Sequence, residues 1–210
     1  MKLQFAIFCF ILFSGCYKES DYLIDSDKSK DLFQVSVDKS ILLADSYSTS
    51  QITVVFDNSV DSTKASTLFK TTAGTFVESN SAIYTVMPKY NYDSSKLIST
   101  VKLKSPLTVD NATVSIQVAG FAKSITVKFN KSYPEYLTLS ANTLALKPKN
   151  NQEGEVVLTN KIFKTLGFPS INNLVDLDVL DSAFHPIGSF RTYSNNTDAN
   201  GNTIYLRSGR

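Results

Sequence analysis

The chain of 210 residues has little of the material from which most catalytic and metal sites are built. It contains one histidine, two cysteines, eight glycines and no tryptophan. A structural zinc site needs about four Cys or His ligands, and a phosphate-binding loop needs a glycine-rich segment, so both are excluded. The 21 Lys and Arg and 19 Asp and Glu residues leave a net charge of only +2, without a basic run, so we expect no nucleic-acid partner.

The single histidine, His185, precedes Pro186 in a segment where a turn is expected. A Ser-His-Asp site would need a nucleophile beside it and an acid to orient it. Asp181 lies upstream, but no Gly-x-Ser-x-Gly motif occurs in the chain. We therefore expect no catalytic residues, no cofactor and no enzymatic activity.

An apolar run lies at the N-terminus. Residues 3–13 are apolar apart from Gln4, they follow Lys2, and the small residues after them stop directly at Cys16. A membrane-spanning helix needs about 20 apolar residues, so this shorter run is typical of a signal peptide. The segment from Leu12 to Cys16 resembles the lipobox of bacterial lipoproteins, with Phe13 in place of the usual aliphatic residue. The resemblance implies cleavage before Cys16 and a lipid on its sulfur.

We therefore expect a lipoprotein signal peptide at 1–15 and a lipidated Cys16 followed by a flexible tether, together 16–32. The alternative is an ordinary secretory signal with an unmodified Cys16. Because Cys9 lies in the removed segment, the mature chain would have no intrachain disulfide. The sequence KESD (18–21) is similar to export signals of surface lipoproteins in Bacteroidetes-type bacteria. This implies an outer-membrane protein at the cell surface, with the periplasmic face as the alternative.

The body of the chain alternates apolar and polar residues over short segments, as β-strands do. Polar turn residues separate these segments, and no long 3.6-residue period indicates a helix. The pattern predicts an all-β fold, with an immunoglobulin-like β-sandwich over 33–130. The expected strands are FQVSV (33–37), QITVVF (51–56), TLFKT (67–71), AIYTV (82–86), LISTVKL (97–103), ATVSIQV (112–118) and SITVKF (124–129).

Residues 35–58 align without gaps on residues 137–160. This repeat predicts a second Ig-like sandwich over 135–210, after a hinge near 131–135. The second copy ends at the equivalent of Ser105 and has no counterpart of residues 106–129, so we expect it to be incomplete at its C-terminus. Either the chain is cut from a longer array, or a partner supplies the missing strands.

Three segments resemble bacterial Ig-like (Big) domains of the invasin and intimin type. They are TLFKTTAGTF (67–76), DSAFHPIGSF (181–190) and TDANGNTIYLRSG (197–209). The resemblance implies β-sandwich domains that build the stalks of adhesins and other surface proteins and carry no catalytic residues of their own.

Two sets of residues are candidate binding sites. Asp176, Asp178 and Asp181 lie in a segment that alternates like a strand, where they could bind Ca²⁺; a solvated sheet face is the simpler interpretation. The tyrosines at 84, 90 and 92 could form an exposed platform for a glycan, although tyrosines are also common on plain edge strands. The three candidates are Tyr84, Tyr90 and Tyr92.

Together these features predict a non-catalytic, membrane-anchored surface lipoprotein whose Ig-like domains serve adhesion, display or spacing. Its expected partners are the membrane, through the lipid anchor, and a host or cell-surface protein or glycan. One alternative is a carbohydrate-binding lipoprotein of an outer-membrane glycan-uptake system. Another is the non-catalytic N-terminal part of a longer enzyme.

Overall fold

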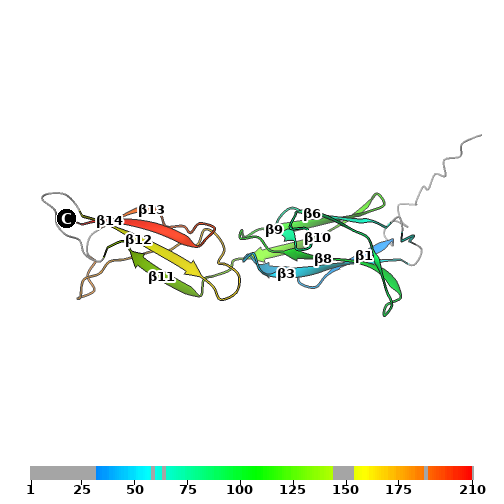
Figure 1. Cartoon of the computed structure of the whole chain (residues 1–210), viewed down its shortest axis with the longest axis horizontal. Helices are drawn as coiled ribbons and strands as arrows, with labels where there is room; N and C mark the ends of the chain where they lie inside the picture. Colours follow the sequence, from blue (N-terminus) through cyan, green and yellow to red (C-terminus); the bar gives the residue numbers. More distant parts are fainter. Residues whose placement is uncertain (1–31, 58–59, 63–64, 144–153, 187–188, 210) are drawn as a thin grey trace, which may run out of the picture. The chain divides into compact units, whose positions relative to one another are not determined.

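The computed structural model describes residues 32–57, 60–62, 65–143, 154–186 and 189–209 (Figure 1). The predicted signal peptide and Cys16 therefore lie outside the described residues, as does nearly all of the tether. Every regular element in the described part is a β-strand, so the prediction of an all-β sandwich fold is confirmed. No helix among these residues is long and apolar enough to cross a membrane.

The first sheet brings together strands that are far apart in the sequence. Its order is β1 (Phe33–Val37), β3 (Thr49–Phe56), β8 (Lys96–Lys104) and β5 (Thr75–Phe76), and β7 (Lys89–Asn91) also pairs with β8. All of these pairs are antiparallel.

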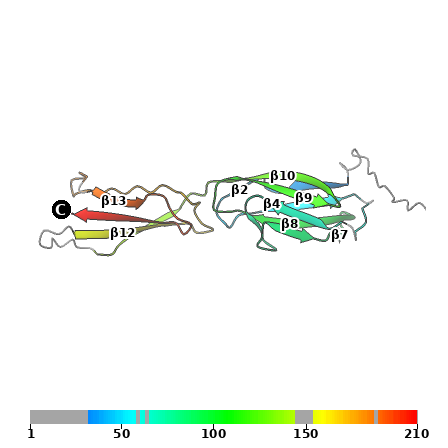
Figure 2. The same ribbon diagram turned by 90° about the horizontal axis from the view of Figure 1, so that it is seen from above.

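The second sheet forms the other layer of the sandwich (Figures 1 and 2). Its order is β2 (Ile41–Leu43), β10 (Phe121–Asn130), β9 (Asn111–Val118), β4 (Thr67–Thr71) and β6 (Ile83–Val86). The pairing of β2 with β10 is parallel, whereas the other pairs are antiparallel. Six of the seven strands expected from the alternation of residues 33–129 lie within strands of these two sheets, and the seventh, expected over 82–86, begins one residue later as β6.

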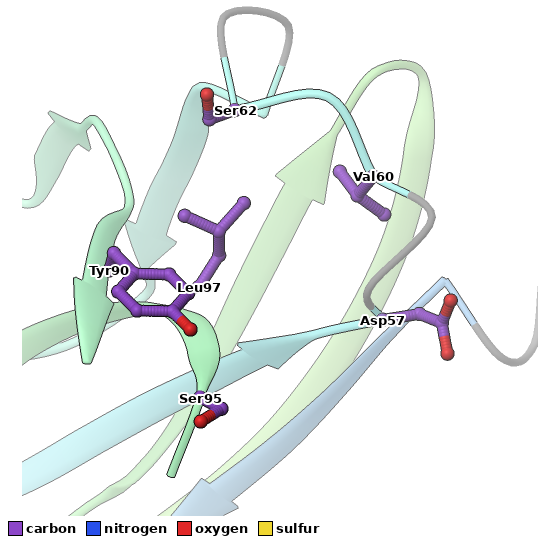
Figure 3. Close-up of a pocket in the computed structure, with 6 residues that line it drawn as sticks. All are labelled: Asp57, Val60, Ser62, Tyr90, Ser95 and Leu97. Carbon is purple, nitrogen blue, oxygen red and sulfur yellow. The ribbon is translucent and has the colours of Figure 1, made fainter. Parts of the chain in front are cut away.

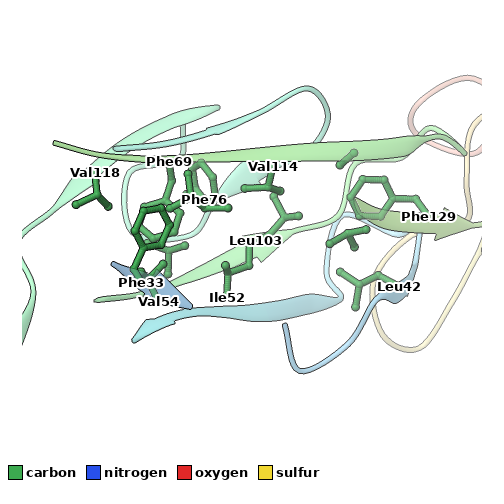
Figure 4. Close-up of a cluster of buried hydrophobic side chains, with 14 of the residues drawn as sticks. Phe33, Leu42, Ile52, Val54, Phe69, Phe76, Leu103, Val114, Val118 and Phe129 are labelled. Atoms are coloured by element: carbon green, nitrogen blue, oxygen red, sulfur yellow. The ribbon is translucent and has the colours of Figure 1, made fainter. Parts of the chain in front are cut away.

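The core of this sandwich is apolar and aromatic (Figure 4). The rings of Phe69 and Phe76, one from each sheet, meet edge to face with centroids 6.0 Å apart. Phe33 and Phe56 are neighbours at 6.3 Å within the first sheet. All four rings are fully or almost fully buried. Because burying one such side chain contributes about 1.5–3 kcal/mol, this aromatic cluster is a main source of the sandwich's stability.

The remaining described strands form a third sheet. Its order is β11 (Tyr136–Ala141), β12 (Gly154–Phe163), β14 (Asn202–Gly209) and β13 (Ser189–Ser194), with every pair antiparallel. This order corresponds to β1-β3-β8-β5 of the first sheet, which supports the predicted repeat. The predicted domain boundaries themselves stay a prediction, since Leu32–Arg210 form one compact unit by their contacts.

The hydrogen-bond register corrects the gapless alignment of the two copies. In the first sheet Val35 pairs with Val54. Their aligned equivalents are Leu137 and Val156, but Leu137 pairs with Ile162 instead, farther along β12. The second copy therefore has extra residues between its first two paired strands, and the gapless alignment is wrong at that point.

Apolar side chains on the first strand of the third sheet are more exposed to solvent than their counterparts in the first sheet. Leu137 and Leu139, the counterparts of Val35 and Val37, are 53% and 52% exposed. In the first sheet both valines pack against the core, which the second sheet completes. The described residues after 135 contain no counterparts of β9 and β10.

Two glycines of the Big-like motifs occupy positions that a side chain would not fit. Gly74 and Gly201 have φ angles of +76° and +77°, in the left-handed region that glycine tolerates. A Cβ on Gly74 would collide with the carbonyl oxygen of Lys104, and one on Gly201 with that of Ile162. Both glycines are therefore required where a turn lies against a neighbouring strand.

Candidate functional site: a cavity beside Tyr90

A cavity of about 620 Å³ lies where β3, β7 and β8 meet the loop that follows β3 (Figure 3). This volume is within the range of about 300–1,000 Å³ that is usual for small-molecule sites. The residues that line it are Asp57, Val60, Ser62, Tyr90, Ser95 and Leu97.

The strand register explains why Tyr90 faces this cavity. Tyr90 of β7 pairs directly with Leu97 of β8, so both side chains project from the same face of the sheet. Leu97 lies on the side of β8 that carries the buried Val101 and Leu103, and it packs against the core. Since β7 is a short strand at the sheet edge, Tyr90 keeps 50% of its surface exposed.

Tyr92 extends the aromatic surface of Tyr90. The two rings are 5.0 Å apart between centroids, at an interplanar angle of 81°. Such an edge-to-face contact is a favourable arrangement for two aromatic rings. Tyr92 is 85% exposed, so the pair presents ring surface to solvent beside the cavity.

Tyr84 does not belong to this pair. It lies on β6 of the other sheet, where it pairs with Phe69 and packs against the core. The structure therefore brings together two of the three tyrosines singled out in the sequence, and it assigns Tyr84 a structural role.

The cavity combines an apolar base with hydroxyl groups. Val60 and Leu97 both pack against the core. Ser95 lies in the turn between β7 and β8 with a φ of +53°, and Ser94 N–H in the same turn donates to Asn91 Oδ1 at 3.1 Å. On the other side, the Val60 N–H donates to the Asp57 carbonyl at 3.1 Å. Such a mixed lining suits a ligand that has both apolar and hydroxyl surfaces.

The acidic candidates are arranged differently from what a metal site requires. The segment around Asp176 and Asp178 is not a strand, contrary to expectation, and forms only isolated bridges at its ends. The alternation is nevertheless present, because both carboxylates are exposed and Val175 is buried. The described residues include no group of three or more His, Cys, Asp or Glu side chains that could hold a metal ion.

Asp181 organises a turn. Its Oδ1 accepts hydrogen bonds from the backbone N–H groups of Ala183 at 2.8 Å and His185 at 2.9 Å. The bond from the His185 backbone is the main cause that lowers the pKa of Asp181. The His185 Nδ1 is 3.5 Å from Asp181 Oδ2, so the histidine predicted to be non-catalytic lies beside the acid of its own turn.

Comparison with known proteins identifies a solved structure with a similar fold. No protein-family model matches the chain, and no curated protein sequence matches it. Among solved structures, the adhesin InvE of Yersinia pseudotuberculosis superposes with a TM-score of 0.51 and 18% identity, over 85% of this chain and 51% of that one. The chain therefore spans about half the length of InvE. This likeness confirms an Ig-like β-sandwich.

Two further solved structures show weaker likeness. The Escherichia coli adhesin FdeC has a TM-score of 0.33 and 16% identity, over 85% of this chain and 55% of that one. Domains 5-6 of the S-layer protein SbsC have a TM-score of 0.30 and 13% identity, over 84% and 83%.

Proposed function

We propose that this chain is a non-catalytic surface lipoprotein, anchored through Cys16, whose Ig-like sandwich serves adhesion, display or spacing. The observation that carries the proposal is the fold, an Ig-like β-sandwich like that of the adhesin InvE, in a chain that begins with a lipobox-like segment. A host or cell-surface protein or glycan is the expected partner.

The physical basis of the anchor is the burial of acyl chains. Each buried methylene contributes about 0.8 kcal/mol, so two or three chains on Cys16 hold the protein durably in a bilayer, whereas one chain would not. The residues between Cys16 and the first strand are rich in charged and polar side chains. A flexible tether of that length spans about 20 Å, enough to separate the sandwich from the lipid headgroups.

The lining of the cavity supports binding rather than catalysis. Among the residues that the structure describes, its lining includes one carboxylate and three hydroxyl groups, and no histidine, cysteine or lysine. General acid-base or nucleophilic catalysis usually pairs a nucleophile with a base within hydrogen-bond reach. This composition therefore favours a ligand-binding surface on a non-catalytic module.

Cells that display the full chain should adhere better than cells that lack it. We expect a non-adherent Gram-negative host that expresses the full chain to be retained several-fold more on epithelial or bacterial cell layers after washing, because many displayed copies bind multivalently. Cys16→Ala is the matched control, since it leaves the sandwich unchanged and removes the anchor. Retention equal to that of cells with empty vector, despite demonstrated display, contradicts an adhesive role.

A further inference from the structure

We propose that the cavity beside Tyr90 is a binding site for a neutral saccharide. In this site the rings of Tyr90 and Tyr92 stack on the C–H faces of different units of the saccharide, and the hydroxyls of Ser62 and Ser95 bond to the sugar's own hydroxyls. The inference rests on the proposed function, because it names the class of ligand that a surface-displayed sandwich would bind.

The aromatic pair provides the stacking surface. Tyr92 is 85% exposed and Tyr90 50% exposed, so both ring surfaces are accessible from solvent. The 81° angle between the rings directs their faces along nearly perpendicular directions. One sugar unit can cover only one of these faces, so a ligand of more than one unit fits the pair better than a monosaccharide does.

The hydroxyl groups provide the polar contacts. A serine hydroxyl can donate one hydrogen bond and accept two, which matches the mixed donor and acceptor character of a sugar hydroxyl. Ser62 and Ser95 lie on opposite sides of the cavity, one on the loop after β3 and one on the β7–β8 turn (Figure 3). Among the described residues, neither side-chain hydroxyl is engaged in a hydrogen bond with the protein.

The charge of the lining selects the class of saccharide. Within the described part of the chain, the lining includes one acidic residue, Asp57, and no lysine, arginine or histidine. Uronic, sulfated and sialylated sugars carry negative charge, and among the described lining residues they would meet the Asp57 carboxylate and no basic side chain. The apolar base of Val60 and Leu97 gives no favourable contact to a small anion either. A neutral saccharide with exposed C–H faces is therefore the ligand that this lining fits.

The test is binding of the lipidated full chain, in detergent micelles, to an array of neutral and acidic oligosaccharides. We expect binding to a neutral member and none to the acidic ones. Tyr90→Ala should weaken binding about tenfold, the loss of one stacking contact of roughly 1.4 kcal/mol. Tyr92→Ala should weaken it several-fold, whereas Tyr90→Phe should retain most of the affinity because the ring is preserved.

Tyr133→Ala is the matched control, since Tyr133 is another exposed tyrosine (68%) that does not line the cavity. No binding to any neutral oligosaccharide, or an equal loss in the Tyr90→Ala and Tyr133→Ala variants, overturns the inference. A Tyr90→Ala variant that melts at the same temperature as the wild type excludes misfolding as the cause of its weaker binding. If displaying cells adhere but no neutral oligosaccharide on the array binds, the saccharide site is wrong and the adhesive role stands. If a neutral oligosaccharide binds but displaying cells do not adhere, only the adhesive role is contradicted.

Discussion

Replacement of Asp45 by alanine is expected to lower the free energy of unfolding of the sandwich by about 3 kcal/mol. The side chain is only 3% exposed. Its Oδ1 accepts hydrogen bonds from Tyr47 N–H at 3.0 Å, Ser48 N–H at 2.7 Å and Ser105 Oγ at 2.9 Å. Its Oδ2 accepts one from the Ser48 hydroxyl at 2.7 Å. Alanine would leave all four donors without this acceptor.

Urea unfolding of the full chain, followed by circular dichroism, measures this loss. Asp176→Ala is the control, because Asp176 is an exposed carboxylate. We expect that variant to unfold within about 0.5 kcal/mol of the wild type, as is usual for surface substitutions. A similar midpoint for Asp45→Ala and the wild type would show that the network contributes little.

The same network predicts how stability depends on pH. Burial by itself raises the pKa of Asp45, but the hydrogen bonds from Ser48, Tyr47 and Ser105 outweigh it and hold the pKa below the ordinary value of 3.8. A carboxyl with a lowered folded-state pKa stabilises the fold above the unfolded-state pKa and loses this contribution as the pH falls through the folded value. The stability difference between wild type and Asp45→Asn should therefore be largest above about pH 4 and shrink at lower pH. A difference that stays constant across this range contradicts the assignment.

Replacement of Cys16 by alanine is expected to abolish lipid attachment altogether. A thiolate is the nucleophile that a cysteine offers to a lipid donor, and alanine has none. The variant should take up no fatty-acid probe in metabolic labelling and should move from the membrane fraction to the soluble fraction. Cys9→Ala is the matched control, because Cys9 lies in the predicted signal peptide and its loss should leave the label unchanged. Equal labelling of wild type and Cys16→Ala contradicts the anchor.

The longer strands were predictable because their alternation is a local property of the sequence. In β3, for example, Ile52, Val54 and Phe56 are all buried on one face. The short strands β2, β5 and β7 have only two or three residues, too few to show a period. The alignment of the two copies failed in register because connecting segments change length without changing strand order.

The candidate site was only partly predictable. The spacing of Tyr90 and Tyr92 along an extended segment places them on one side, and the structure shows them in contact. Tyr84 is close to both in sequence, but β6 and β7 belong to different sheets. Val60 and Ser62 line the cavity because β3, which precedes them, pairs with β8. The local sequence of neither strand indicates which distant strand it pairs with.

Labelling of intact cells with an antibody against the full chain tests the central claim, that a lipid on Cys16 holds the sandwich at the cell surface. We expect strong labelling of intact cells that express the wild type. For Cys16→Ala we expect labelling at background level, with the chain recovered in soluble form. Labelling that is equal for the two chains, or that requires permeabilisation of the outer membrane, would contradict the claim.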